Sequence, residues 1–307
     1  MDLNGKRALI TGASSGIGRA VALRLAAQGT QLAVSARRPD LLEALADEIE
    51  QAGAPRPQVL VADLSQAGAA AQLASAGIER LGQVDIVVNN AGGGLGGQQT
   101  TVGDRDEGRD VFELNVWSPL ALVQRLVPAM RARRMGAVVN VTSMMQLMTW
   151  PFMGHYTASK AALASFTETL RLELRGSGVH VLEVIPGPVD TPIYGESHLV
   201  PGFEAAARGL RPGRPDALAK RVVRALRRER KRLIYPGILR PTYSFPSVVR
   251  AAAGFQVGRV KADIDPDDDR VVRSGSQGDE VSRQARAAWE RGERDLGRLR
   301  ALARSGQ

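Results

Sequence analysis

Residues 7–18 read RALITGASSGIG, and this stretch decides the expected fold. Its apolar start predicts a strand, its glycines predict a tight turn, and the apolar residues Val21, Leu23 and Leu25 that follow predict a helix. Glycine lets the backbone approach a pyrophosphate, whose charge is stabilised by the N–H groups and dipole of a helix N-terminus. The spacing departs from G-x-G-x-x-G, so this turn predicts a dinucleotide cradle only if strand and helix units continue beyond it.

Such units do continue along the chain. Apolar runs rich in Val, Ile and Leu recur at 31–35, 58–62, 84–88, 136–141 and 179–185, separated by helix-like stretches, and 233–235 would be the last strand. This alternation predicts an α/β fold, a doubly wound parallel sheet with helices on both faces. In open sheets of this kind, ligands bind beyond the carboxyl ends of the strands.

A tyrosine and a lysine four residues apart, Tyr156 and Lys160, would share one face of a helix. A cation beside a phenol lowers its pKa from about 10, which lets the tyrosine exchange a proton with a substrate oxygen. The pair arises by chance on many exposed helices, so its meaning depends on the motifs around it.

Six motifs follow one another in a familiar order: Thr11-Gly12-x-x-x-Gly16-Ile17-Gly18, Asn89-Asn90-Ala91-Gly92, Asn115, Ser143, Tyr156-x-x-x-Lys160 and Pro186-Gly187. In these residues the chain resembles the short-chain dehydrogenase/reductase family, over roughly residues 3 to 238. The resemblance implies a Rossmann-like fold and an oxidoreductase that interconverts a carbonyl and an alcohol.

The resemblance also implies a catalytic group of Asn115, Ser143, Tyr156 and Lys160. Tyr156 would be the acid or base, and Lys160 would lower the Tyr156 pKa and bind the nicotinamide ribose. Ser143 would donate to the reacting oxygen, and Asn115 would hold a water near Lys160. Taken singly, Ser143 could be a helix cap and Asn115 a turn residue or a satisfied helix residue.

The end of the second strand bears on the choice of cofactor. NAD-binding proteins carry an acid there for the ribose hydroxyls, but this chain has Ala36-Arg37-Arg38. Arg37 offers a planar charged fork suited to a phosphate, which resembles the NADP-preferring members, although both arginines could be solvated loop charges. Asp63 resembles the adenine contact and could also be a helix cap. The expected cofactor-binding residues are Gly12, Ser14, Ser15, Gly16, Ile17, Gly18, Arg37, Arg38, Asp63, Asn90, Tyr156, Lys160, Pro186, Gly187, Val189 and Thr191.

An apolar stretch precedes Tyr156 and contains Met144, Met145, Leu147, Met148, Trp150, Phe152 and Met153. Methionine adapts to irregular apolar shapes, so this stretch predicts a pocket for a bulky apolar ketone, aldehyde or secondary alcohol, with core packing as the alternative. His155 is interpreted as an ordinary, partly exposed histidine. Glycines at 93, 94, 96 and 97 predict a flexible loop, either a lid over the site or a permissive surface loop.

The composition limits the other possibilities. With no cysteine among 307 residues, disulfides and thiolate chemistry are excluded, and the three histidines lack metal-ligand spacing, so no metal is expected. No apolar run approaches the ~20 residues of a membrane span, and the expected location is cytoplasmic. We expect a homodimer or homotetramer.

Positive charge is concentrated in residues 204–250, which hold thirteen Lys and Arg against three Asp and Glu. A helix is predicted from 215 to 232, with Leu218, Val222, Ala225 and Leu226 facing inward and Arg221, Arg224, Arg227, Arg228 and Lys231 facing outward. A solvated helix face explains such a run, and weak contact with anionic membranes is an alternative. Nucleic acid is not an expected partner, because no aromatic-interleaved or helix-turn-helix pattern accompanies the charge.

The predicted domains are a dinucleotide-binding catalytic domain, 1–238, and a C-terminal extension, 239–307, that is partly helical or disordered. Residues 265–269 and 274–278 are predicted to be solvated linker, and 285–303 a loosely attached helix. The favoured function is an NADPH-dependent carbonyl reductase or alcohol dehydrogenase acting on an apolar small molecule. The alternatives are a catalytically silent NADP-binding scaffold or sensor, and the same enzyme attached peripherally to a membrane.

Overall fold

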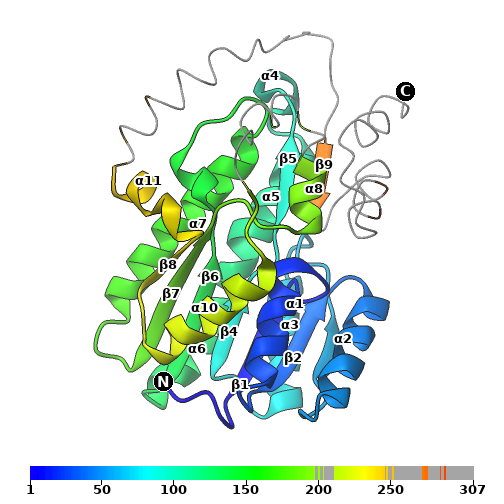
Figure 1. The fold of residues 1–307 in the computed structure, drawn as a ribbon, viewed down its shortest axis with the longest axis vertical. Helices are drawn as coiled ribbons and strands as arrows, with labels where there is room; N and C mark the ends of the chain where they lie inside the picture. The colour runs from blue at the N-terminus through cyan, green and yellow to red at the C-terminus, as the bar shows by residue number, and fades with distance from the viewer. Residues whose placement is uncertain are drawn as a thin grey trace.

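The computed structural model describes residues 1–197 and 211–245, the segment 272–275, and the single residues 200, 203, 247, 251, 284 and 287. A seven-stranded sheet in the order β3-β2-β1-β4-β6-β7-β8 runs through the centre, and all its strands are parallel (Figure 1). These strands are β1 (Arg7–Thr11), β2 (Gln31–Ala36), β3 (Gln58–Val61), β4 (Ile86–Asn89), β6 (Gly136–Val141), β7 (Val179–Pro186) and β8 (Arg232–Tyr235).

Helices cover both faces of the sheet and build two apolar cores. One face packs against α1 (Gly16–Ala26), α2 (Pro39–Gln51) and α10 (Pro215–Arg227). The other packs against α3 (Ala69–Leu81), α6 (Ser118–Ala132) and α7 (Gly154–Glu173). Because neither face meets water, β4 and β6 are buried along their whole length and read as continuous apolar runs. The predicted doubly wound α/β fold is confirmed.

Shorter elements follow the carboxyl ends of the strands. After β4 come β5 (Gly93–Gly96), α4 (Gln99–Val102), α5 (Asp106–Phe112) and a π-helical turn η1 (Glu113–Trp117). After β6 comes η2 (Met144–Leu147), after β7 comes α8 (Pro192–Ser197), and after β8 come η3 (Gly237–Leu239) and α11 (Arg240–Ser244). A last strand, β9 (Val272–Gly275), pairs antiparallel with β5.

Two sequence-based predictions about loops are wrong. The glycines at 93, 94 and 96 are buried in strand β5 rather than exposed in a flexible loop, because β9 pairs with one edge of that strand. The start of the predicted linker 274–278 belongs to β9, since Ser274 and Gly275 pair with Gly94 and Gly93. The predicted linker 265–269 and, apart from residue 287, the predicted helix 285–303 lie outside the described residues.

The basic helix is shorter than predicted. Helix α10 ends at Arg227 instead of residue 232, and the chain reverses at Glu229, which has a φ of 49°, before β8 begins. The predicted inward stripe is buried and the predicted outward arginines are exposed. Among the described residues, none of the helices is both long and apolar enough to cross a membrane.

Candidate active site

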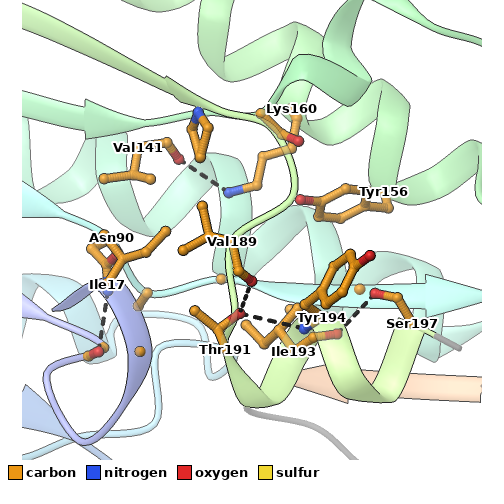
Figure 2. A pocket seen from close by; sticks show the side chains of 18 of the residues that line it. Ile17, Asn90, Val141, Tyr156, Lys160, Val189, Thr191, Ile193, Tyr194 and Ser197 are labelled. Atoms are coloured by element: carbon orange, nitrogen blue, oxygen red, sulfur yellow. Dashed lines mark hydrogen bonds between the residues drawn. The ribbon is translucent and has the colours of Figure 1, made fainter. Parts of the chain in front are cut away.

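A pocket of about 410 Å³ opens at the carboxyl ends of the parallel strands. The turn between β1 and α1, the ends of β2, β4, β6 and β7, and the first turn of α7 all contribute to its lining. Figure 2 shows Ile17 and Asn90 on one side of it, Tyr156 and Lys160 on another, and the segment from Val189 to Ser197 below them. The sheet therefore gathers residues of the predicted motifs into one cavity, although Gly18 and Asn115 are not part of its lining.

The glycine turn is a cradle that only glycine can form. Gly12 and Gly16 have φ angles of 65° and 56°, a region that other residues rarely adopt. A Cβ atom on Gly12 would lie 2.8 Å from the Cα of Ala91, and one on Gly18 would collide with the Gly12 carbonyl oxygen. The turn is thus packed directly against the end of β4.

Asn90 fastens this turn through its side chain. Its Nδ2 donates to the carbonyl oxygens of Thr11 and Gly12, at 3.0 and 3.1 Å. The hydroxyl of Thr11 accepts from the backbone N–H groups of Asn90 and Ala91 and donates to the Val88 carbonyl. Asn90 lines the pocket as predicted, and its amide is used to hold the glycine turn in place.

The start of α1 fits the pyrophosphate of a dinucleotide. Ser15 occupies the N-cap position, yet its side chain makes no capping hydrogen bond, and the first helical turn contains no acidic residue. The first N–H groups of a helix have no partners inside the helix, and the helix dipole favours an anion beside them. Ser14, Ser15, Gly16 and Ile17 all line the pocket at this point.

Arg37 and Arg38 stand directly after β2 and line the same pocket, together with Asp63. An ion pair joins Arg37 to Asp63 at 3.7 Å, with each side chain 35% exposed. Asp63 also accepts from the backbone N–H and the hydroxyl of Ser65, at 3.1 and 2.8 Å. Asp63 therefore caps a local turn and pairs with Arg37 at the pocket, but it is not a helix cap, because α3 begins at Ala69 with Gly68 as its N-cap.

The catalytic candidates meet at the start of α7. Lys160 is 4% exposed, and its Nζ donates to the carbonyl oxygen of Val141 at 3.2 Å (Figure 2). Ser143 lies beside Tyr156 and acts on its pKa, and the Ser143 Oγ accepts from the backbone N–H of Met145 at 3.2 Å. Ser143 is thus both a cap of η2 and a partner of Tyr156.

The two ionisable groups respond to burial in opposite directions. Burial raises the pKa of Tyr156, and the hydrogen bond with Ser143 partly offsets this rise. Burial also lowers the pKa of Lys160 to about 8. The net direction for Tyr156 is therefore opposite to the expected lowering by Lys160, because the loss of hydration on burial is the largest influence on the Tyr156 pKa.

Asn115 is fully buried in the π-helical turn η1. Its Oδ1 accepts from the Gly93 N–H at 3.1 Å, and its Nδ2 donates to the Gly93 carbonyl and to the Ser159 hydroxyl, both at 2.9 Å. Ser159 in turn donates to the carbonyl of Tyr156 at 2.8 Å. The side chain of Asn115 therefore ties β5 to the catalytic helix, and its predicted water-holding role stays a prediction.

The apolar wall is mostly where the sequence predicts it. Met144, Met145, Met148, Trp150 and Met153 line the pocket. Leu147 and Phe152 do not belong to this lining, and the carbonyl of Phe152 instead accepts from the Gly97 N–H at 2.8 Å. His155 lies outside the lining and bonds to Gln99 and to the Gly103 carbonyl, as expected for a partly exposed histidine.

The segment after β7 supplies both predicted and unpredicted lining. Pro186, Gly187, Val189 and Thr191 line the pocket as expected. Sequence reasoning missed further lining residues, which are Ile193, Tyr194, Ser197, Phe203, Leu239 and Thr242. Their position after the carboxyl ends of β7 and β8 was the available signal, because no motif marks them.

A profile of the short chain dehydrogenase family matches residues 6–199 of this chain. The chain belongs to this family. Among curated short-chain dehydrogenases, one from Pseudocercospora fijiensis is 40% identical over 190 residues, which cover 62% of this chain and 61% of that protein. The 11-beta-hydroxysteroid dehydrogenase 1A of Arabidopsis thaliana is 32% identical over 251 residues, covering 79% of this chain and 71% of the relative.

Solved short-chain dehydrogenases share the fold. A structure from Burkholderia phymatum in complex with NAD has a TM-score of 0.71 and 28% identity, and covers 81% of this chain and 97% of the other. A metagenomic short-chain oxidoreductase in complex with NADP has a TM-score of 0.63 and 29% identity, and covers 76% and 98%. The family uses nicotinamide cofactors, and its solved members hold either NAD or NADP.

Proposed function

We propose that this short-chain dehydrogenase is an NADP(H)-dependent oxidoreductase that interconverts a carbonyl and an alcohol on an apolar small molecule. The observation that carries the proposal is the juxtaposition of Tyr156, Ser143 and Lys160 with the glycine cradle in one pocket. A silent scaffold needs the glycine cradle but has no use for the hydroxyls of Tyr156 and Ser143 placed together in the same pocket.

The chemistry assigns a role to each side chain. A bound nicotinamide supplies the hydride in reduction and accepts it in oxidation. The Tyr156 hydroxyl donates its proton to the carbonyl oxygen, and the Ser143 hydroxyl hydrogen-bonds to that oxygen. The raised pKa of Tyr156 keeps the phenol protonated at neutral pH, which suits the acid of the reductive direction. The Lys160 ammonium stabilises the phenolate that remains.

The preference for NADP(H) rests on the end of β2. Ala36 stands where an acid would bind the ribose hydroxyls, and Arg37 and Arg38 stand beside it at the pocket. A guanidinium binds a phosphate through charge-assisted hydrogen bonds, while Asp63 keeps Arg37 oriented. An acid at Ala36 would repel the same phosphate.

The apolar substrate is supported by the wall of methionines and Trp150 opposite the cradle. Methionine accommodates irregular apolar shapes and imposes little polar recognition. The Arabidopsis relative is named for a hydroxysteroid, which is a bulky apolar alcohol. We therefore expect cyclic and aryl ketones to be better substrates than small polar aldehydes.

The test is reduction of acetophenone, α-tetralone and decanal, followed by the absorbance of NADPH or NADH. We expect turnover with NADPH at least about tenfold more efficient than with NADH, the value of one charge-assisted hydrogen bond. Tyr156→Phe should lower kcat by about 10²- to 10⁴-fold. Tyr194→Phe, which removes a pocket hydroxyl outside the catalytic group, is the control and should retain turnover.

The cofactor assignment has its own arm in this experiment. Ala36→Asp combined with Arg37→Ala should reverse the preference toward NADH, because an acid then faces the ribose and the phosphate loses its cation. Equal efficiency of the two cofactors in the unmodified protein would remove Arg37 from the phosphate site. Normal turnover by Tyr156→Phe would remove Tyr156 from the chemistry.

A further inference from the structure

Strand β9 brings the C-terminal extension to the edge of the active site. It runs antiparallel to β5, with Val272 opposite Gly96 and Gly275 opposite Gly93, and Figure 1 shows it beside β5 and α8. The C-terminal extension is therefore attached to β5 by a strand pair, although β9 is far from the catalytic motifs in the sequence. A glycine-rich strand has no β-branched side chains to order it, so its order depends on what its backbone pairs with.

The two edges of β5 are held by different partners. A strand directs the N–H and C=O groups of successive residues to opposite edges. Both groups of Gly93 are bound by the Asn115 side chain, which is itself bonded to Ser159 on α7. Gly94 and Gly96 accordingly present their backbone groups to the other edge, where Ser274 and Val272 stand opposite them.

Two neighbouring side chains of β9, Arg273 and Val272, reinforce this attachment. Arg273 forms an ion pair with Glu107 of α5 at 3.2 Å, with 30% and 18% of the side chains exposed. Arg273 is also one of the charges that lower the Glu107 pKa to about 2, after Arg105. Next to Arg273, Val272 packs over Gly96, where a Cβ atom would lie 3.5 Å from the Val272 Cβ.

The elements that β9 contacts are walls of the pocket. Gly93 and Gly94 of β5 line it, and so do Ile193, Tyr194 and Ser197 of α8, which packs against both β9 and β5. The buried Val200 follows α8, and its side chain lies 2.8 Å from where a Cβ on Gly96 would be. Any shift of β9 would act first on these two walls, because β9 pairs with β5 and packs against α8.

We propose that strand β9 of the C-terminal extension is a specificity-determining part of the substrate pocket, which sets the positions of β5 and α8. The residues of β9 are positioning residues, because residues of β5 and α8 line the pocket and the described residues of β9 do not. The proposal rests on the substrate pocket of the proposed function. It predicts that loosening β9 weakens the binding of large substrates and spares both the cofactor and the chemical step.

The experiment uses full-length Arg273→Glu, which places two carboxylates together, with Arg273→Lys as the matched control that keeps the charge. For α-tetralone we expect Arg273→Glu to raise KM about tenfold while kcat changes less than about twofold, the pattern of lost uniform binding. KM for acetaldehyde and the affinity for NADPH should stay at the values of the unmodified protein. Ser274→Pro, which removes a backbone donor of β9, should act in the same direction.

Hydrogen exchange separates this proposal from the proposed function, because it needs no substrate. The backbone N–H groups of the peptide containing Gly94 and Gly96 should exchange faster in Arg273→Glu and Ser274→Pro. Their exchange rate should be unchanged in Arg273→Lys. Unchanged exchange in both disrupting variants would overturn the role of β9, even if all variants are active. A variant in which the affinity for NADPH falls as much as KM for α-tetralone rises would also overturn the role of β9. If the unmodified protein reduces no ketone, only the proposed function is overturned.

Discussion

Lys160 combines a functional position with an unfavourable environment. Its ammonium group is almost fully enclosed and has the Val141 carbonyl as a hydrogen-bond acceptor, and its pKa falls to about 8. An unfolded lysine titrates near pH 10.4, so folding transfers a charge into a poorly hydrated site at neutral pH. The burial of Lys160 thus lowers the free energy of unfolding at neutral pH, and the site requires it.

Lys160→Met should therefore abolish turnover but stabilise the cofactor-free protein at pH 7, by about 2 kcal/mol after allowing for the lost hydrogen bond. The folded pKa lies below the unfolded one, so the full cost applies below pH 8. It shrinks as the pH rises from about 8 toward the unfolded value, because the folded lysine then becomes neutral and no longer buries a charge. Urea unfolding at pH 7 and pH 10 measures both values.

The control for this prediction is Lys220→Met, which removes an exposed lysine from α10 and should leave the free energy of unfolding nearly unchanged at both pH values. The assigned cost of burial would be contradicted if Lys160→Met were less stable than the unmodified protein at pH 7. It would also be contradicted if the gain in the free energy of unfolding grew with pH.

At the scale of elements, the turn between β1 and α1 depends on two separate properties of glycine. Gly12 has a positive φ. In addition, a Cβ atom added to Gly12 would lie only 2.8 Å from the Cα of Ala91. Gly53 has a positive φ of 84° but nothing within 4 Å of such a Cβ. Comparing the two glycines separates backbone strain from close packing.

Gly53→Ala should lower the free energy of unfolding by about 1–2 kcal/mol, the cost of a left-handed backbone alone. Gly12→Ala should cost more than that, because Ala91 and the Asn90 amide must also move, and it should weaken NADPH binding. Thermal unfolding and NADPH titration of both variants provide the comparison. Equal losses of stability would mean that the turn can yield to a methyl group.

The sequence predicts elements well where the signal is local. Strand β6 begins and ends at its predicted residues, and the strands predicted at 31–35, 58–62 and 84–88 differ from prediction by no more than two residues at an end. The catalytic group could be placed together because parallel strands bring their carboxyl ends to one edge. The direction of the Tyr156 pKa shift could not be predicted from the sequence, since it depends on burial created by distant segments.

Non-local pairing was the part that sequence could not supply. Gly93–Gly96 has the composition of a flexible loop, and Val272–Gly275 follows a strongly charged stretch. Each segment becomes a strand only because the other lies beside it. The walls formed by α8 and α11 were missed for a related reason, since their residues carry no motif and reach the pocket through the path of the chain.

At the scale of the whole molecule, α10 and the turn after it display a cluster of arginines on one face of the sheet. Arg224 and Arg227 of α10 are exposed there together with Arg228 directly after it, whereas α3 and α6 cover the opposite face. Each cation near an anionic lipid surface contributes about 1 kcal/mol, and salt screens this attraction over a Debye length of about 10 Å at 0.1 M. We propose weak, salt-sensitive attachment to such surfaces through this face.

Co-sedimentation with phosphatidylserine vesicles at low and high salt tests this proposal, with phosphatidylcholine vesicles alongside. Changing Arg224, Arg227 and Arg228 together to Gln should abolish recovery at low salt. Changing Arg80, Arg125 and Arg131, which are exposed on α3 and α6, removes the same charge from the other face and should preserve recovery. The same recovery in every condition would leave these arginines as solvated charges.

Trp150 gives the molecule a built-in optical reporter. The chain has three tryptophans, and Trp150 lines the pocket. Trp117 lies 52% exposed on the outer side of the helices, against Phe166. Indole emission overlaps the absorption of a reduced nicotinamide ring, so energy transfer from Trp150 will reveal when that ring occupies the cavity. Occupancy can thus be followed by fluorescence in the unlabelled protein, before any substrate is known.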